Sequence, residues 1–378
     1  MPRYKLIFIF FSLKILFSPT SGSCFDQKSQ YEKQLLVTDL AVDTNGIPFL
    51  LDDTGEVWGF SKPFSLTDLV KIRGLRTVSK FSPYIALTSA GDVFAWGLDS
   101  KSSRWKSPDD LAAVYTKSVH LFNGHQASSI DYKNGRFLAG FHDGNIAEWS
   151  FSDQREGKLF ENPTIYHVPS NVLSVATSGH VNLAKIEGET FFGWGLNKSN
   201  QFLETSPFQN RISTPNALSL QDGVKIISTT DSHLVVLNNL GIVTYQGGCD
   251  AGAEDSTFGE RITETKIKNV SDIAVSVDDN IFPDGFVVGN GEIWLGYAPS
   301  PRVSPGCGRS FANGMRVQKI LGMNVPAVHV AVVSDGGKEF QIFSIGSDKS
   351  FWAARSENGH FLFSKVNLKV TNEQHERN

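Results

Sequence analysis

Short runs of alternating apolar and polar residues, separated by small polar turns, recur along most of the chain. Residues 78–97 read VSKFSPYIALTSAGDVFAWG, and residues 172–195 and 224–247 follow the same order. Each has an alternating strand, a turn, a second apolar strand, another turn and a third strand ending in an aromatic residue near glycine. Alternation with a period of two residues is typical of half-buried β-strands, and helical spacing is scarce. The pattern predicts an all-β protein.

The aromatic end of the third strand marks a repeat. It falls 38, 53, 45, 51 and 49 residues apart, at Trp58, Trp96, Trp149, Trp194, Tyr245 and Trp294. Weaker copies cover 40–59, 119–150 and 270–296, and the last covers 340–363, with turns at Ser347-Asp348 and Asn358-Gly359. A repeat of this size matches a four-stranded propeller blade, which must stack in a ring to bury its faces. We predict a β-propeller of about seven four-stranded antiparallel blades over residues 34–366, with the aromatic residues packed between blades.

The two ends of the chain differ from the repeats. Arg3 and Lys5 precede an apolar run over 6–13, and Ser21 and Ser23 precede Cys24. These features predict a secretory signal peptide over 1–23 and a secreted or lumenal protein. A mitochondrial presequence is also basic and is the alternative. Lipidation of Cys24 would require a bacterial source, and residues 367–378 are predicted to be a polar C-terminal tail.

The charge of the chain narrows the class of partner. There are 35 basic and 39 acidic residues, with no strongly basic cluster. Binding to nucleic acid or to a membrane surface requires clustered Lys and Arg. No stretch after the first segment approaches the roughly 20 apolar residues of a membrane span. We expect a monomer that binds a protein partner.

Signatures of catalysis and metal binding are missing from the sequence. It contains no His-Glu-x-x-His zinc motif, no Gly-x-Ser-x-Gly nucleophile elbow and no Gly-rich phosphate loop with Lys. His125, His180 and His233 are expected at equivalent turns before the second strand of their blades, and therefore separated around the ring. We expect no catalytic residue, no cofactor and no metal ion.

Loops at a rim of the propeller are the expected binding elements, because rigid strands present variable connections there. In residues 98–110, Trp105 lies between Arg104 and Lys106 in an otherwise polar sequence. Trp and Arg are enriched at interface hot spots, so these three residues are candidates for partner binding. The alternative is that Trp105 covers a neighbouring blade edge.

A second loop, residues 295–315, is rich in Pro, Gly and Ser and carries Arg309 as a further candidate contact. Cys307 in this loop and Cys249 form an even pair in an oxidising compartment. A disulfide between them would hold the loop beside the acidic loop 250–260. Two free thiols are the alternative.

Two sequences fit the N-glycosylation pattern, which matters only in a eukaryotic secretory route. Asn197 starts Asn-Lys-Ser after a hairpin and is expected to be exposed. Asn269 starts Asn-Val-Ser at the opening of a strand and is the poorer candidate.

Among propellers, the motifs favour one family. The chain has no Trp-Asp dipeptide, and Gly-Gly is rare. Residues 194–197 (Trp-Gly-Leu-Asn), 201–203 (Gln-Phe-Leu), Pro215 and 96–99 (Trp-Gly-Leu-Asp) resemble the regulator of chromosome condensation repeat. That family repeats Trp-Gly-x-Asn, then Gly-Gln-Leu-Gly and a later Pro, and it places a His where His180 and His233 occur. Asn200 replaces the first Gly of the second motif.

The expected function is protein binding through one rim of a secreted or lumenal propeller. The resemblance implies a guanine-nucleotide exchange factor for a small GTPase, which the predicted signal peptide and the acidic balance oppose. A mitochondrial presequence would favour an exchange or assembly factor in an organelle. A hydrolase or lyase is a third interpretation, and carboxylates and His converging at one mouth of the ring would indicate it.

Overall fold

The computed structural model describes residues 33–43, 46–60, 66, 69–96, 117–119, 126–150, 163–197, 202, 211–218, 220, 224–229, 233–247, 262–264, 267–275, 284–297, 316–334, 340–357 and 360–370. The predicted signal peptide and Cys24 lie outside these residues. Among the described residues, thirty strands form seven four-stranded antiparallel sheets and one two-stranded sheet. No helix in this part of the chain has the length and apolar character that crossing a membrane requires.

The strands are numbered in chain order. Blade 1 consists of β2 (Val37–Val42), β3 (Pro48–Asp52), β4 (Val57–Phe60) and β5 (Leu69–Lys71). Blade 2 consists of β6 (Val78–Ser82), β7 (Ile85–Thr88), β8 (Val93–Ala95) and β9 (Lys117–Val119). Blade 3 consists of β10 (Ala127–Lys133), β11 (Arg136–Phe141), β12 (Asn145–Ser150) and β13 (Thr164–His167). Blade 4 consists of β14 (Val172–Thr177), β15 (Val181–Ile186), β16 (Phe191–Leu196) and β17 (Arg211–Leu218). Blade 5 consists of β18 (Val224–Thr229), β19 (His233–Asn238), β20 (Val243–Gly247) and β21 (Ile262–Glu264). Blade 6 consists of β22 (Val270–Ala274), β23 (Asp284–Val288), β24 (Ile293–Tyr297) and β25 (Arg316–Ile320). Blade 7 consists of β26 (Ala327–Ser334), β27 (Phe340–Gly346), β28 (Phe351–Glu357) and β29 (His360–Lys365). The two-stranded sheet pairs β1 (Lys33–Gln34) with β30 (Lys369–Val370).

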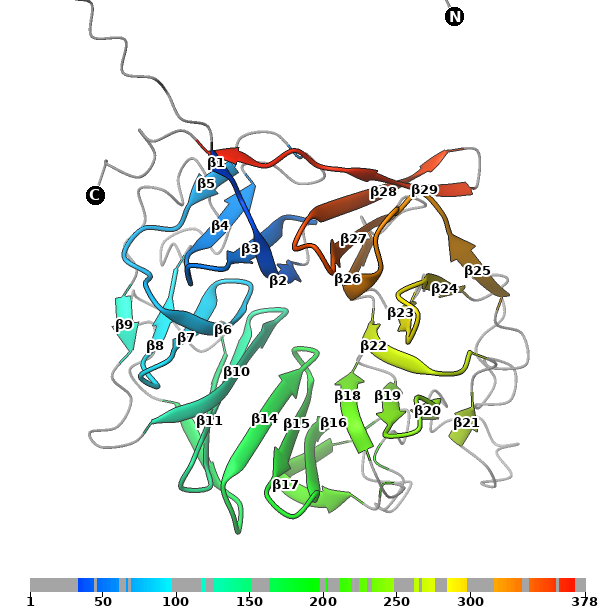
Figure 1. Ribbon diagram of the computed structural model, residues 1–378. Helices are drawn as coiled ribbons and strands as arrows, with labels where there is room; N and C mark the ends of the chain where they lie inside the picture. The colour runs from blue at the N-terminus through cyan, green and yellow to red at the C-terminus, as the bar shows by residue number, and fades with distance from the viewer. Residues whose placement is uncertain are drawn as a thin grey trace, which may run out of the picture. The chain divides into compact units, whose positions relative to one another are not determined.

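The blades form a closed ring. Consecutive strands pair in chain order within each blade. The first strand of every blade contacts the first strand of the next, and the contact from β26 returns to β2. Figure 1 shows these seven inner strands around the centre of the ring. The structure therefore confirms the predicted all-β propeller of four-stranded blades.

Apolar side chains fill the spaces between neighbouring blades. One buried cluster joins Phe49 of blade 1, Tyr84 of blade 2 and Phe137 of blade 3, and the rings of Phe49 and Tyr84 meet edge to face at 5.2 Å. The aromatic residues of the third strands are at most 4% exposed at Trp58, Trp96, Trp149, Trp194 and Trp352. The predicted role in packing between blades is confirmed at Trp58, Trp96, Trp149 and Trp194. Trp294 is only partly buried and lines a cavity, and the side chain of Tyr245 lies outside the described residues.

A backbone hydrogen bond repeats at the junctions between blades. The first amide of an inner strand donates to the carbonyl of a turn residue in the preceding blade. These bonds measure 2.9 to 3.2 Å and run from Val78 to Gly55, Ala127 to Gly91, Val270 to Gly241, Ala327 to Gly291 and Val37 to Lys349. The last of them joins blade 1 to blade 7 and closes the ring.

Glycine suits these turns for two reasons. The four glycines have φ between 73° and 87°, a left-handed conformation that disfavours other residues. The neighbouring blade also comes very close: a Cβ on Gly291 would lie 2.4 Å from Cβ of Pro326 and 2.8 Å from N of Ala327. At the closing junction Lys349 adopts the same conformation with φ of 63°, and its Nζ lies 3.5 Å from Oδ2 of Asp53 in blade 1.

The ends of the described chain also meet at this closing junction. Strand β1 pairs with β30, and the amide of Leu35 donates to the carbonyl of Leu368 at 3.1 Å. Figure 1 shows the blue start and the red end of the ring together. Leu368 and Val370 are buried with Leu35 and Val37. The predicted boundary at residue 366 is therefore too early, because these apolar residues extend the folded part to Val370.

Two turn predictions have different outcomes. Ser347-Asp348 lies in the turn between β27 and β28, as predicted, whereas Asn358-Gly359 lies outside the described residues. His180 and His233 do stand at the start of second strands. His125 lies outside the described residues, and Ala127, two residues later, begins the first strand of blade 3 rather than its second. The repeat predicted over 119–150 therefore begins in β9, the outer strand of blade 2, and counts the inner strand β10 as a second strand.

We predict that Gly291→Ala destabilises the fold more than Gly188→Ala. Both residues are left-handed, with φ of 78° and 84°, so both substitutions carry a conformational cost of about 1 kcal/mol. A Cβ at Gly188 meets no atom of the described residues within 4 Å, whereas one at Gly291 overlaps the next blade. Urea unfolding should show about 1–3 kcal/mol of additional loss for Gly291→Ala. Equal losses would contradict the tight junction.

Candidate functional site

The connections between strands divide between two faces of the ring. In an antiparallel meander, the second-to-third connections lie at the opposite ends of the strands from the third-to-fourth connections. The second-to-third connections have three or four residues in every blade: 53–56, 89–92, 142–144, 187–190, 239–242, 289–292 and 347–350. The third-to-fourth connections of blades 2 to 6 have thirteen or more: 96–116, 151–163, 197–210, 248–261 and 298–315. We name these two sides the short-turn face and the long-connection face.

The candidate contact residues belong to the long-connection face. Arg104, Trp105 and Lys106 belong to the β8–β9 connection, and Arg309 belongs to the β24–β25 connection. All four lie outside the described residues. The strands that carry both connections are nevertheless described, and they begin and end these connections on the same face. The described strand ends that flank both connections therefore lie on one side of the ring.

The predicted disulfide also belongs to this face. Cys249 is in the β20–β21 connection of blade 5, and Cys307 is in the corresponding connection of blade 6. Both cysteines lie outside the described residues. A bond between them would join corresponding connections of adjacent blades, and it stays a prediction.

Asn197 is buried, so its expected exposure is wrong. It is 2% exposed, and its Oδ1 accepts a hydrogen bond from the amide of Phe202 at 3.1 Å. The Phe202 ring is fully buried and packs where Gly193 has no side chain, since a Cβ there would lie 2.5 Å from the ring. The Trp-Gly-x-Asn resemblance therefore marks a packing motif in blade 4.

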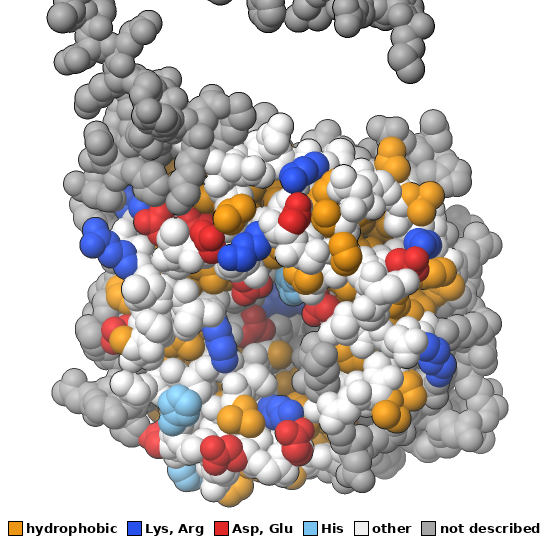
Figure 2. All heavy atoms as spheres, in the orientation of Figure 1, with side chains coloured by type: hydrophobic (Ala, Val, Ile, Leu, Met, Phe, Trp, Pro, Cys, Tyr) orange, Lys and Arg blue, Asp and Glu red, His pale blue; other side chains and the backbone are white. Residues whose placement is uncertain are grey.

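Polar side chains from three adjacent blades meet at the centre of the ring. Each inner strand has a β-bulge between its first and third residues, and the third residues are Asp39, Lys80, Ser129, Ser174, Ile226, Asp272 and His329. His329 Nδ1 lies 2.7 Å from Asp272 Oδ2, and His329 Nε2 lies 3.3 Å from the Leu40 carbonyl and 3.9 Å from Asp39 Oδ1. Figure 2 shows the hollow centre with acidic, basic and His side chains gathered in it.

The electrostatics of this cluster fix the protonation of His329. Burial lowers the pKa of its imidazole, but the charge and hydrogen bond of Asp272, with Asp39 and the Leu40 carbonyl, outweigh burial and raise the pKa to about 9. Burial also raises the pKa of Asp39, although His329 partly opposes this. At neutral pH His329 is therefore a cation that donates from both nitrogens. A general base needs a free nitrogen and a pKa near the working pH, and His329 has neither. The contacts of His329 instead link blade 7 to blades 6 and 1.

This cluster was not predicted from the sequence, although the sequence contains a signal for it. Asp39 and Asp272 both follow a Val by two residues and precede Leu or Ile, in Val-Thr-Asp-Leu and Val-Ser-Asp-Ile. Aligning the starts of the inner strands would have placed both carboxylates at the same level of the ring. His329 occupies the same place in Ala-Val-His-Val.

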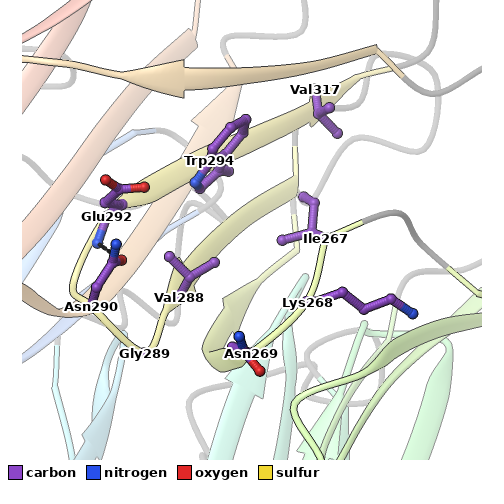
Figure 3. A pocket seen from close by; sticks show the side chains of 9 residues that line it. All are labelled: Ile267, Lys268, Asn269, Val288, Gly289, Asn290, Glu292, Trp294 and Val317. Atoms are coloured by element: carbon purple, nitrogen blue, oxygen red, sulfur yellow. Dashed lines mark hydrogen bonds between the residues drawn. The ribbon is translucent and has the colours of Figure 1, made fainter.

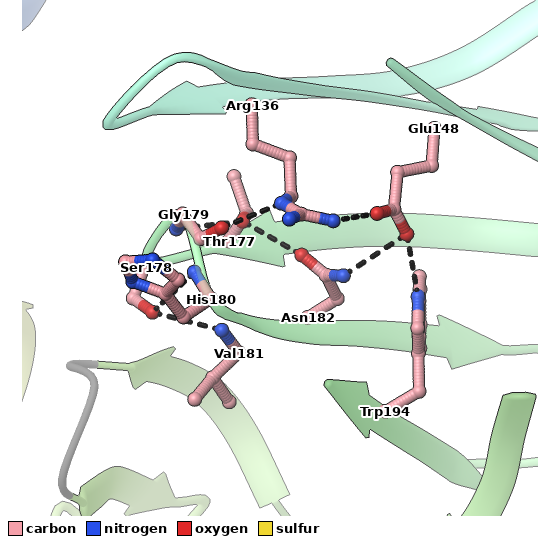
Figure 4. A network of polar contacts seen from close by, with 9 residues as sticks. All are labelled: Arg136, Glu148, Thr177, Ser178, Gly179, His180, Val181, Asn182 and Trp194. Carbon is pink, nitrogen blue, oxygen red and sulfur yellow. Dashed lines mark hydrogen bonds and ion pairs between the residues drawn. The ribbon is translucent and has the colours of Figure 1, made fainter. Parts of the chain in front are cut away.

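A second polar network joins blades 3 and 4 (Figure 4). Arg136 pairs with Glu148, whose Oε2 also accepts hydrogen bonds from Trp194 Nε1 at 2.8 Å and Asn182 Nδ2 at 3.1 Å. Arg136 Nε donates to the Gly179 carbonyl at 2.5 Å. Glu148 is 8% exposed, so its charge depends on these partners. The network is a tie between blades.

A cavity of about 540 Å³ opens on the short-turn side of blade 6 (Figure 3). Trp294 and Val288 form part of its wall, and Asn269, Asn290 and Glu292 supply polar groups. The ammonium of Lys319, hydrogen-bonded to the Glu292 carboxylate, lowers the pKa of that group, and the Trp294 indole also donates to it. The volume falls in the range of small-molecule sites. This cavity was not anticipated from the sequence.

The described residues contain no group of three or more His, Cys, Asp or Glu side chains placed to hold a metal ion. His180 and His233 stand in separate blades, as expected from the repeat.

We predict that part of the stability depends on the charge of His329. Its folded pKa of about 9 exceeds the unfolded value of 6.5, so its stabilisation is complete below pH 6.5 and is lost as pH rises through 9. The contribution is on the order of 1–2 kcal/mol, allowing for solvent screening. Denaturation of the wild type and His329→Gln should show a difference that shrinks over this range. A constant difference would contradict the tie.

We predict that Glu148→Gln lowers the free energy of unfolding by about 3–5 kcal/mol, because the largely buried guanidinium of Arg136 loses the carboxylate that balances its charge. The double variant Arg136→Met, Glu148→Gln should recover a large part of this loss. Urea denaturation of both single variants and the double variant measures the coupling. Additive losses would show that the two side chains do not act as a pair.

Comparison with known proteins supports the fold. Human WBSCR16 matches with a TM-score of 0.55 and 18% identity over 78% of this chain and 84% of that chain. Prp20p from Saccharomyces cerevisiae, described with its binding properties to Gsp1p and histones, matches with a TM-score of 0.50 and 13% identity over 88% of this chain and 77% of that chain. No family model and no curated protein sequence matches the chain. At these identities the similarity shows that the chain shares the β-propeller fold of these two proteins.

Proposed function

We propose that this chain is a secreted or lumenal protein-binding propeller and that its partner contacts the long-connection face. The observation that carries the proposal is the difference between the two faces. Connections of three to seven residues, within and between blades, form one face, whereas the third-to-fourth connections of blades 2 to 6 on the other face have thirteen or more. Long connections on a rigid scaffold are the usual carriers of recognition.

The short-turn face is committed to the ring itself. At five junctions a short-turn residue accepts the hydrogen bond that joins one blade to the next, and a Cβ at any of the four glycines among these residues would come within 3.1 Å of the neighbouring blade. In the connection 197–210, the described residues Asn197 and Phe202 pack in blade 4. We propose that the rest of the long connections carries the recognition.

The composition of two long connections supports protein binding. The β8–β9 connection contains Arg104, Trp105 and Lys106, and the β24–β25 connection contains Arg309. Trp and Arg give interfaces a large apolar area and multiple hydrogen-bond donors, which is why they dominate hot spots. The fold shared with Prp20p, which is described with protein partners, agrees with this class of function.

The central cluster does not favour a hydrolase or lyase. Carboxylates and His do converge there, which is the arrangement that such an enzyme would need. However, both nitrogens of His329 are engaged and its pKa of about 9 keeps it protonated at neutral pH. Binding is therefore the function that the described groups support better. If the protein is found in an organelle, small GTPases are the first class of partner to test for binding.

The proposal predicts that Trp105→Ala weakens partner binding by at least about tenfold, a loss of about 1.4 kcal/mol typical of a hot spot. The partner is isolated on the full chain from its own source, purified, and titrated against each variant by calorimetry. Arg309→Ala tests the second connection. The mature amino terminus, expected near Cys24 in a secreted or lumenal fraction, tests the location separately.

Leu240→Ala provides the matched control on the opposite face. Leu240 lies in the β19–β20 turn and is 75% exposed, so its truncation removes apolar surface without opening the core. Binding should stay within about twofold of the wild type, as for a residue outside the interface. Loss of binding in Leu240→Ala, with Trp105→Ala and Arg309→Ala unaffected, would assign the partner to the short-turn face and contradict the proposal.

A further inference from the structure

The two N-glycosylation sequences differ in the exposure of their asparagine. The side chain of Asn197 is buried and holds the Phe202 amide, so it cannot carry a glycan without opening blade 4. Asn269 is exposed, in the segment that leads from blade 5 to β22. Its carbonyl accepts a hydrogen bond from Gly289 at 2.7 Å, which fixes the backbone. The order of preference expected from the sequence is reversed.

Backbone conformation alone does not account for an Asn at this place. Asn269 has φ of 57°, and Asn tolerates the left-handed region better than most residues. Thr77 occupies the corresponding place before the inner strand of blade 2 and has nearly the same φ, 54°. The fold therefore accepts another residue type at this position. Ser271 completes the acceptor sequence, and its hydroxyl donates to the Val287 carbonyl at 3.1 Å.

Asn269 also lines the cavity of blade 6. In Figure 3 the Trp294 ring and the Val288 and Ile267 side chains surround the hollow, and Asn269 stands at its lower edge. Val317, on the same wall, is 38% exposed. An indole beside aliphatic groups, with the Glu292 carboxylate and the Asn290 amide nearby, offers one apolar platform and several hydrogen-bond acceptors. Sugar rings combine an apolar C–H face with a rim of hydroxyls, and such a site suits them.

We propose that Asn269 carries an N-linked glycan and that its inner sugars lie over the Trp294 cavity. This inference rests on the proposed secretory route. The donor is a lipid-linked pyrophosphate oligosaccharide of the host cell. Asn269 Nδ2 forms a bond to the anomeric carbon of the first sugar, the bond from that carbon to the pyrophosphate oxygen breaks, and Nδ2 releases one proton. No oxidant or reductant takes part.

The attachment is tested with the full mature chain expressed behind a heterologous cleaved signal sequence in eukaryotic cells. This makes the result independent of the chain's own leader. Peptide mass spectrometry before and after glycosidase digestion should find one glycan on Asn269, and Asn269→Asp should abolish the mass shift while keeping a residue that tolerates the left-handed region. Ser199→Ala, which removes only the Asn197 acceptor sequence, should leave the glycan unchanged.

The position of the sugars is tested by hydroxyl-radical footprinting. Trp294 should oxidise several-fold more slowly in the glycosylated protein than in the Asn269→Asp variant, while Ile165, which is 41% exposed in the outer strand of blade 3, should react equally in both. A secreted protein with Asn269 unmodified would overturn the proposal. A glycan on Asn269 with unchanged oxidation of Trp294 would overturn the placement over the cavity. Failure of the native leader to direct secretion would instead contradict the proposed function.

Discussion

The ring depends on one repeated contact, the hydrogen bond from the first amide of an inner strand to a left-handed turn residue of the preceding blade. It brings two backbones so close that glycine is needed at Gly291, where a Cβ would overlap Pro326. The same bond closes the ring, with Lys349 in place of glycine. Since each blade has two apolar faces to bury, every junction must form for the cores between blades to exist. Closure is strengthened where the ends of the folded chain pair in β1 and β30.

Because of this constraint, the short turns hold contacts that stabilise the ring, whereas the proposed partner contacts belong to connections that start and end on the other face. The short turns are shaped by the junctions, and the polar groups of the interior serve the same purpose. His329 joins blade 7 to blades 6 and 1 at the closing point, and Glu148 joins blade 3 to blade 4. Both clusters resemble active sites in composition, but their donors and acceptors are paired with one another.

The sequence predicted the fold well because its signals are local and repeated. Alternation and the third-strand aromatics, such as Trp58 and Trp194, each report burial between blades. Predictions that depended on register were weaker. The repeat predicted over 119–150 merged an outer strand with the next inner strand. Asn197 was expected at the surface because its hydrogen-bond donor, the amide of Phe202, does not belong to a strand of the repeat. The cluster at His329 is set by bulges and by contacts across three blades, which no single repeat displays.

The partner-binding face is the central claim, and amide hydrogen exchange of the full chain with and without its purified partner tests it most directly. Peptides covering 96–116 and 298–315 should become protected on binding, while the turns 239–242 and 289–292 exchange as they do in the free protein. Protection confined to those short turns, with both long connections unchanged, would contradict the account.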